Sequence, residues 1–309
     1  MILITGGTGQ IGRHLVQELK NHKIPFKVMV RREEARASLE AKGIKAVLGD
    51  FTQPGSYIPA LAGIQEIFLL STLHPDLVGQ EGAFLTAAGQ AGVRRVVRLS
   101  AIGANPASSS PLLSVHGLCE ARLEGSGLSW TILRPTMFMQ NLVPMYGNSV
   151  ATTATFYAPA GAARIPFVDT RDVAAVAAAI LTTPGHDRLV YDITGPELIT
   201  YEGIAELLSS QVGRTIKFVD VPDDTVYQSM TDMGATPWFA HGIITLFHQF
   251  RANAGTAVVT GTVPRLTGKP ARTLAAYLQE NIHAFRSPKA GAAAPTAGPP
   301  AARSLTRKA

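Results

Sequence analysis

Three glycines near the start of the chain are spaced three residues apart, at Gly6, Gly9 and Gly12. A short apolar run precedes them and a stretch with helical periodicity follows, so they occupy a turn between a strand and a helix. Glycine lets the backbone approach a ligand closely, and the free N–H groups that open a helix bind phosphate. In this context the spacing predicts a dinucleotide site, and an ordinary glycine-rich turn is the alternative. The contacting residues that we expect are Gly6, Thr8, Gly9, Gln10, Ile11 and Gly12.

Two arginines, Arg31 and Arg32, directly follow a second predicted strand at residues 26–30. In a dinucleotide-binding sheet this position lies beside the adenine ribose, where an acid selects NAD and a cation pairs with the 2′-phosphate of NADP. The arginines therefore predict NADP(H) as the preferred cofactor, with NAD(H) possible. The alternative is a solvated basic start to the next helix.

Polar residues also end the next three predicted strands. Asp50 and Phe51 follow the third strand, where the carboxylate is placed to accept from the adenine amino group and the ring to pack on adenine. Asp50 has the alternative role of capping the next turn. Ser71 and Thr72 end the fourth strand, on the side of the ribose and nicotinamide, and Ser100 ends the fifth.

Strands and helices alternate along most of the chain, which predicts a parallel sheet with right-handed crossovers. The fold class that we expect is α/β, a Rossmann-type doubly wound parallel sheet with a small C-terminal α+β substrate lobe. Residues 104–111 form a candidate lid, residues 140–164 cross the cleft, and residues 223–251 are helical with an interruption at Pro237. Further strands are expected at 45–51, 67–72, 95–103, 129–135 and 189–193, and helices at 77–91, 113–125, 172–181 and 202–212.

The expected unit spans residues 1–286. Its Rossmann core comprises about residues 1–135 and 166–196, and its substrate lobe about 136–165 and 197–286. Residues 287–309, rich in Ala and Pro with scattered basic residues, cannot build a core and are expected to be disordered.

The composition fits a globular protein with a sizeable core. Part of the net charge of +6 comes from Lys289, Arg303, Arg307 and Lys308, so it is weak evidence for nucleic acid, which we do not expect as a partner. The single cysteine, Cys119, excludes an internal disulfide and fits a reducing compartment. Neither a signal peptide nor a membrane span is expected, so we predict a cytoplasmic protein, either a monomer or a homodimer.

Several of these segments together resemble the NmrA-like atypical short-chain dehydrogenases/reductases. The resemblance includes the glycine turn, Arg31, Gly49-Asp50, and the segments 131–135 and 138–141, and it extends through 165–174, 191–197 and 270–274. It covers about residues 1–286. It implies a nicotinamide-dependent reductase of quinones, azo dyes or triphenylmethane dyes, or a catalytically silent NADP sensor that binds transcription regulators.

The usual proton-donating pair of short-chain dehydrogenases, Tyr-x-x-x-Lys, is missing. None of the seven tyrosines is followed four residues later by lysine, and His116 to Glu120 occupy the expected place of the motif. A simple ketone would give a basic alkoxide and needs a positioned acid. A quinone or cationic dye spreads or neutralises the charge, so its position against the nicotinamide suffices.

Three residues are candidates for catalysis. His116 is placed to donate a proton or to orient the ribose or the substrate, and Glu120, four residues on, could hold His116 or be surface charge. Ser100 either lines the nicotinamide pocket or caps the strand. Pro135 and Phe138 are expected to wall the nicotinamide, and Cys119 is interpreted as a core residue.

The predicted substrate pocket contains Met139, Tyr157 and Trp238. Plain core or a dimer interface is the alternative for the aromatic cluster around Trp238. No spacing of His, Cys and acids suggests a metal. The expected function is NADPH-dependent hydride transfer to a conjugated aromatic acceptor, such as a quinone, quinone imine or azo compound. The alternatives are an NADP(H)-sensing regulator and, less favoured, an isomerase or epimerase.

Overall fold

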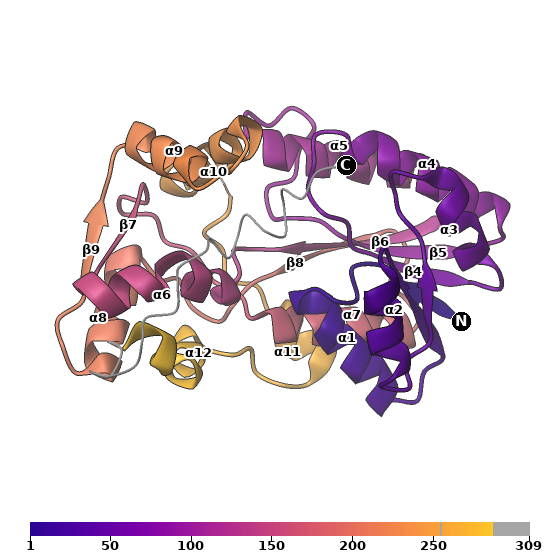
Figure 1. Cartoon of the computed structure of the whole chain (residues 1–309), viewed down its shortest axis with the longest axis horizontal. Helices are drawn as coiled ribbons and strands as arrows, with labels where there is room; N and C mark the ends of the chain where they lie inside the picture. Colours follow the sequence, from indigo (N-terminus) through magenta and orange to yellow (C-terminus); the bar gives the residue numbers. More distant parts are fainter. Residues whose placement is uncertain (254, 287–309) are drawn as a thin grey trace.

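The structure, a computed structural model, describes residues 1–253 and 255–286. Its centre is a seven-stranded parallel sheet of order β3-β2-β1-β4-β5-β6-β8 (Figure 1). The order reverses between β1 and β4, which confirms the predicted Rossmann-type sheet. The strands are β1 (Ile2–Ile4), β2 (Phe26–Val30), β3 (Ala46–Leu48), β4 (Glu66–Leu69), β5 (Arg95–Leu99), β6 (Ser129–Pro135) and β8 (Leu189–Ile193).

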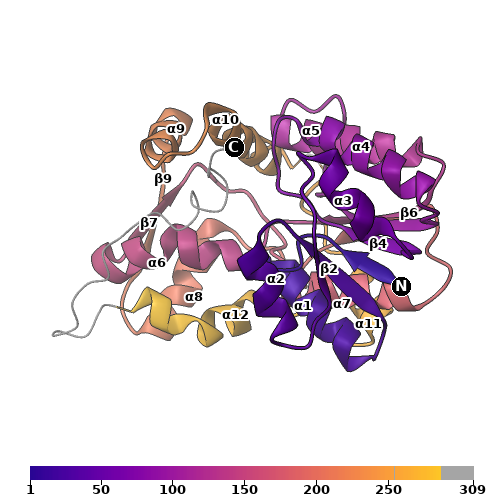
Figure 2. The ribbon, with the colours of Figure 1, turned by 45° about the vertical axis from the view of Figure 1, so that its right-hand side comes forward.

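Helices cover both faces of the sheet because alternate side chains of each strand point to opposite sides. In β5, Val97 and Leu99 join the core under one helix layer, whereas Val96 joins the core under the other. The first layer contains α1 (Gln10–Asn21), α2 (Glu33–Glu40), α7 (Thr170–Thr182) and α11 (Thr262–Thr267). The second contains α3 (Pro54–Leu61), α4 (Leu77–Gln90) and α5 (Pro111–Glu124) (Figure 2).

A lobe stands beyond one end of the sheet (Figure 1). Its buried core surrounds Tyr201, whose ring lies 5.8 Å from Phe247 and 6.0 Å from both Phe167 and Tyr146. The strands β7 (Thr155–Ala158) and β9 (Lys217–Asp220) form a separate parallel pair. The helices of the lobe are α6 (Leu142–Thr153), α8 (Tyr201–Val212), α9 (Asp223–Asp232), α10 (Pro237–Arg251) and α12 (Leu274–Glu280). Its 3₁₀ turns are η1 (Met139–Asn141) and η2 (Ile282–Phe285).

Two segments differ from expectation. Residues 140–164, predicted only to cross the cleft, contain α6 and β7, and residues 54–61 form the unpredicted helix α3. Pro144 of α6 and Pro54 of α3 lie in the first turn, where the missing N–H interrupts no hydrogen bond, and α3 also contains Pro59 in its interior.

No helix in the described ranges is long and apolar enough to cross a membrane. The segment 287–309, predicted to be a disordered tail, lies outside the described residues. The division of the chain into a Rossmann core and a substrate lobe stays a prediction.

Candidate active site

The glycine turn lies between β1 and α1, and two of its glycines are required by geometry. Gly6 has φ +64°, and a Cβ there would lie 2.9 Å from the Leu70 carbonyl oxygen. A Cβ at Gly12 would overlap the Gly6 carbonyl oxygen and lie 2.6 Å from the Gly7 Cα. Any larger residue at Gly12 would therefore push α1 away from β1.

The N-terminus of α1 is open to an anion. Its N-cap, Gly9, has no side-chain cap, and the first turn carries no acid. The N–H groups of Gln10, Ile11 and Gly12 precede the first hydrogen bond into the helix, which Arg13 N donates to Gly9 O. Thr8 and Gln10 are exposed on the turn and Ile11 is buried. An open helix N-terminus of this kind suits a pyrophosphate, and the binding of the cofactor here stays a prediction.

Arg31 and Arg32 follow β2, next to β1 in the sheet, and both side chains are exposed. Within the described part of the chain neither forms an ion pair, whereas nearby Arg36 is bound by Glu33 at 2.6 Å. Two cations thus remain available beside the predicted ribose position.

Asp50 and Phe51 follow β3. The Asp50 Oδ1 accepts from Thr52 N and Thr52 Oγ1, both at 2.9 Å, so this carboxylate caps a turn. This is the alternative role that the sequence offers for Asp50, and its Oδ2 makes no hydrogen bond with the described residues. The half-buried Phe51 ring packs edge-on against Phe84, with the centroids 4.9 Å apart.

Buried hydroxyl groups line the carboxyl edge of the three neighbouring strands β4, β5 and β6. Ser71, Ser100 and Thr136 follow these strands closely, and each hydroxyl oxygen is inaccessible and without a hydrogen-bond partner in residues 1–253 and 255–286. An unpartnered buried hydroxyl is costly, so a row of three indicates a polar ligand at this edge. The nicotinamide ribose and carboxamide of a dinucleotide on the glycine turn fit that requirement.

The walls around this edge come from the ends of β4 and β6. Pro135 is buried and ends β6, and its carbonyl oxygen accepts from Ile102 N at 3.0 Å. Phe138 is half-buried and bridges to Val168, while Thr72 is exposed. The chain leaves the sheet for the lobe just after β6 and β8, so the edge faces the lobe (Figure 1).

His116 lies on α5 and faces the sheet. Its Nδ1 is 3.5 Å from Nη1 of Arg98, a fully buried arginine on β5. Burial, and then the charge of Arg98, lower the pKa of His116 from 6.5 to about 3. The ring is therefore neutral at physiological pH and has no acidic proton to give as an imidazolium.

Glu120 does not hold His116, and it is not surface charge either. It is 4 % exposed, and its Oε1 accepts from Arg134 Nε at 2.9 Å. Because α5 spans two strands, His116 meets the arginine of β5 and Glu120 meets the arginine of β6. Cys119 is buried among Leu77 and Val115, and burial raises its pKa to about 12, so it is a neutral thiol.

The three residues predicted for a substrate pocket are not brought together. Met139 is 1 % exposed in the lobe core, and Trp238 packs against Leu77 and Cys119 on the sheet side. Tyr157 is 52 % exposed, because the alternation of β7 turns its neighbour Phe156 into the core instead. Tyr157 therefore faces solvent and does not line a pocket with Met139 and Trp238.

A cavity of about 390 Å³ opens near the end of β5, lined by Gly103, Ala104, Asn105, Ser108 and Gln249. The Gln249 Nε2 of α10 donates to Ser108 Oγ at 2.8 Å and so ties the predicted lid loop to the lobe. Sequence reasoning missed Gln249, because a lone amide in an apolar helix carries no motif.

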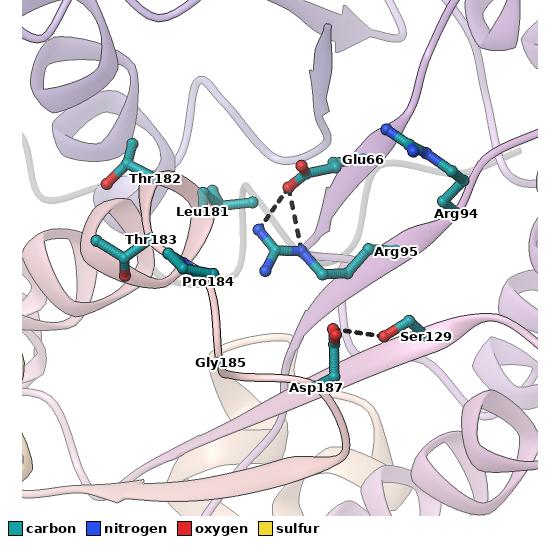
Figure 3. Close-up of a pocket in the computed structure, with 10 residues that line it drawn as sticks. All are labelled: Glu66, Arg94, Arg95, Ser129, Leu181, Thr182, Thr183, Pro184, Gly185 and Asp187. Carbon is teal, nitrogen blue, oxygen red and sulfur yellow. Dashed lines mark hydrogen bonds and ion pairs between the residues drawn. The ribbon is translucent and has the colours of Figure 1, made fainter.

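A second cavity of about 390 Å³ lies at the opposite edge, where β4, β5 and β6 begin (Figure 3). Its charged groups are largely satisfied: Arg95 is bound to Glu66 at 2.6 Å, and Ser129 donates to Asp187 at 2.5 Å. Ligands of open α/β sheets bind at the carboxyl edge, so the first cavity is the candidate acceptor site. No group of three or more potential metal ligands occurs in the described ranges.

Residues 6–184 match a family of NAD(P)H-binding proteins. The NAD(P)H azoreductase of Xenophilus azovorans is 36 % identical over 285 residues, which cover 92 % of this chain and 99 % of the relative. The NADPH-dependent quinone oxidoreductase of Escherichia coli, solved in complex with NADPH, superimposes with a TM-score of 0.82 at 25 % identity, over 91 % of this chain and 100 % of the other.

The triphenylmethane reductase of Citrobacter sp., complexed with NADP(H), shares the fold, with a TM-score of 0.79 at 24 % identity over 90 % of this chain and 99 % of the other. The glycine turn, the unpaired arginines after β2 and the row of hydroxyls thus occur in a chain that aligns over nearly its full length with these proteins. The chain belongs to the NAD(P)H-binding family and, within it, to the NmrA-like atypical short-chain dehydrogenases/reductases.

Proposed function

We propose that the protein is an NADPH-dependent reductase that transfers hydride directly to a conjugated acceptor such as a quinone, quinone imine or azo compound. Relatives that reduce azo compounds and quinones support this class of acceptor. When bound, NADPH supplies the hydride from its nicotinamide ring. The residues of the chain bind the cofactor, orient the acceptor and stabilise the charge that develops on it.

The observation that carries this proposal is the position of His116, whose Nδ1 lies 3.5 Å from the guanidinium of Arg98. It stands where a short-chain dehydrogenase has its acidic tyrosine, yet its pKa of about 3 leaves it uncharged. A neutral ring can donate a hydrogen bond but gives up its proton reluctantly. Such a site suits a quinone or azo acceptor, which spreads the added charge and takes its proton from solvent, and does not suit a simple ketone.

Each group of site residues has a role in this proposal. The turn 6–12 holds the pyrophosphate, and Arg31 with support from Arg32 holds the 2′-phosphate, which favours NADPH and leaves NADH as a weaker cofactor. Ser71, Ser100 and Thr136 donate to the nicotinamide half. Pro135 and Phe138 form the wall behind the ring.

The acceptor occupies the cavity between the loop after β5 and α10. Ser108 and Gln249 supply the polar contacts there, and a flat aromatic molecule of moderate size suits a volume of about 390 Å³. A cytoplasmic location and a monomeric or homodimeric state remain predictions.

NADPH consumption with a panel of acceptors tests the function. We expect steady oxidation of NADPH on addition of an azo dye or a quinone and none with a simple aliphatic ketone. A Gln249→Ala variant should raise the KM for the acceptor and keep NADPH affinity at the wild-type level. Oxidation of NADPH by the ketone alone, or tight NADPH binding without oxidation by any acceptor, would contradict the proposal, and the second outcome would favour a sensor.

A further inference from the structure

The arginine that faces His116 is itself one half of a buried ion pair, to which no role has yet been given. Arg98 on β5 is 0 % exposed and Glu81 on α4 is 2 % exposed. The Arg98 Nε donates to Glu81 Oε2 at 2.7 Å, and the Arg98 Nη1 lies 3.5 Å from His116 Nδ1. The three side chains form a line from Glu81 on α4 through Arg98 on β5 to His116 on α5, all on the face of the sheet that these two helices cover.

Stability does not account for this pair. Removing two charges from water costs about as much as their attraction returns, and apolar residues of similar volume often serve as well or better. Leu77, Val115 and Cys119 form an apolar cluster on the same two helices, and the Cys119 thiol also hydrogen-bonds to Glu81 and Arg98. A charged pair retained in such surroundings points to a task other than holding the helices together.

The chemistry of arginine restricts what His116 can be. A guanidinium carries only donors and keeps its proton, so the ring nitrogen that faces it must present a lone pair. Nδ1 faces Arg98, and the proton of the neutral ring therefore sits on Nε2. Glu81 holds the guanidinium from the other side, which fixes the direction of its N–H groups.

We propose that Arg98, anchored by Glu81, is a positioning residue that holds His116 as a neutral imidazole protonated on Nε2, so that this nitrogen donates a hydrogen bond at the reaction edge. Its use in catalysis rests on the proposed function. The strand-end hydroxyl of Ser100, two residues beyond Arg98, lies on the same side of β5. The pair of donors, His116 Nε2–H and Ser100 Oγ–H, takes the place of a tyrosine–lysine pair.

The other titratable groups around His116 leave this assignment intact. Glu120 and Cys119 come from its own helix; the first is bound to Arg134 and the second is a neutral thiol. Glu81 from α4 is bound to Arg98, and α10 packs the uncharged Trp238 against Leu77, Val115 and Cys119. Among the described residues, Arg98 is the one charged group whose field shifts the pKa of His116.

Nuclear magnetic resonance of ¹⁵N-histidine-labelled protein with NADP⁺ bound tests the assignment without any turnover. The His116 signals are identified by their loss in His116→Gln, and the exposed His241 provides a reference. We expect a proton on Nε2, a bare Nδ1, and no titration between pH 8 and pH 5. A proton on Nδ1, or titration of His116 near pH 6.5, would overturn the proposal.

A double substitution separates positioning from plain support of the fold. Glu81→Leu with Arg98→Met removes both charges at similar volume. We expect the two tautomers of His116 to mix and its pKa to rise. We also expect kcat to fall by about tenfold, the equivalent of one hydrogen bond, and to become pH-dependent, while the KM for NADPH stays unchanged. Arg98→Lys, which keeps a cation, should restore part of the tautomer preference.

The matched control is the ion pair at the other end of the same strand, Arg95 with Glu66 (Figure 3). Glu66→Leu with Arg95→Met should leave the His116 signals and the pH profile as in the wild type. If the Glu81→Leu/Arg98→Met variant also leaves the His116 signals and the pH profile unchanged, the Arg98–Glu81 pair is structural only and the proposal fails. If the expected tautomer is found but no acceptor is reduced, the proposed function fails and the assignment of Arg98 stands.

Discussion

Arg31 and Arg32 are the residues that we propose distinguish NADPH from NADH. Both follow β2 and are exposed, and neither forms an ion pair with a described residue. Arg36, one turn later, is held by Glu33 and Glu40 instead. The first two arginines are therefore free to bind a 2′-phosphate, and the third is not.

Arg31→Ala should weaken NADPH binding far more than NADH binding. Loss of a charge-assisted contact costs about 1.5–3 kcal/mol, which corresponds to roughly 10- to 150-fold in the Kd of NADPH. Fluorescence titration with both cofactors measures the difference, and Arg36→Ala should change neither Kd. An equal loss of affinity for NADPH and NADH would show that Arg31 does not bind the 2′-phosphate.

The depressed pKa of His116 also predicts how stability depends on pH. The ring is neutral in the folded protein down to a pKa of about 3, whereas the unfolded chain takes up a proton near its ordinary 6.5. The contribution of His116 to the free energy of unfolding is therefore fully present above pH 6.5. It decreases by about 1.4 kcal/mol per pH unit as the pH falls toward 3.

Between pH 4 and pH 6, the free energy of unfolding of His116→Gln should therefore fall less steeply with decreasing pH than that of the wild type. The difference between the two slopes should correspond to at most one proton, and denaturant unfolding measures it. His241→Gln is the control, since its ring is exposed on α10 and in water in both states. Identical slopes for wild type and His116→Gln would mean that the ring is charged in the folded protein.

The partners of single side chains were the least predictable feature of the site. The sequence placed His116 and Glu120 four residues apart on one helix, which suggested that they meet. Their partners depend on where α5 lies across the sheet, and that is set by packing between elements far apart in the chain. The arginines that hold them, Arg98 and Arg134, come from two different strands.

At the scale of elements, the contact between β1 and α1 sets the position of the phosphate site. A Cβ at Gly12 would overlap the Gly6 carbonyl, and only displacement of the helix would relieve it. The glycine spacing could be recognised from sequence because this contact is local, within seven residues. α6 was missed because its small residues give weak periodicity and its packing partners, such as Ala284, lie more than a hundred residues away.

Gly12→Ala should destabilise the protein by about 1–3 kcal/mol and abolish tight cofactor binding, because overpacking moves the first turn of α1. Thermal unfolding and NADPH titration measure the two effects. Gly79→Ala is the control: an added Cβ on α4 meets nothing within 4 Å, and stability should stay equal or rise slightly. Wild-type NADPH affinity in Gly12→Ala would show that the turn does not hold the pyrophosphate.

For the molecule as a whole, polar links between α7 and the lobe hold the two parts around the carboxyl edge. Asp172 of α7 is 3 % exposed, accepts from Arg272 N at 2.8 Å and forms an ion pair with the Arg272 guanidinium. Asp169 accepts from Gln140 at 2.9 Å, and Arg171 contacts Glu280 at 2.8 Å. The contacts with Arg272 and Glu280 join residues 100 or more positions apart, the Gln140–Asp169 bond joins residues 29 positions apart, and none of them was visible in the sequence.

Arg272→Ala should lower stability by about 1–2 kcal/mol, because it leaves a buried carboxylate with only a backbone N–H. It should also raise the KM for the acceptor, since the lobe forms one side of the acceptor cavity. Lys269→Ala is the control, as that exposed side chain forms no ion pair with described residues. An unchanged melting temperature in Arg272→Ala would show that the Asp172–Arg272 ion pair does not stabilise the contact between α7 and the lobe.

The fold was predictable because alternating apolar strands and helices specify a parallel sheet, and with it the edge where ligands bind. The acceptor cavity was not, because Ser108 and Gln249 meet only when α10 packs over the loop after β5. The predicted pocket residue Tyr157 is solvent-facing for the same kind of reason, since pairing with β9 sets which side of β7 is buried.

Direct hydride transfer is the central claim, and an isotope comparison tests it most directly. Flavin-free protein would be mixed anaerobically with a reducible azo dye or quinone and with NADPH that carries deuterium on either face of nicotinamide C4. We predict that NADPH oxidation requires the acceptor and is slowed by deuterium on one face only. Oxidation that needs added flavin, or bound NADPH that no acceptor oxidises, would contradict the account.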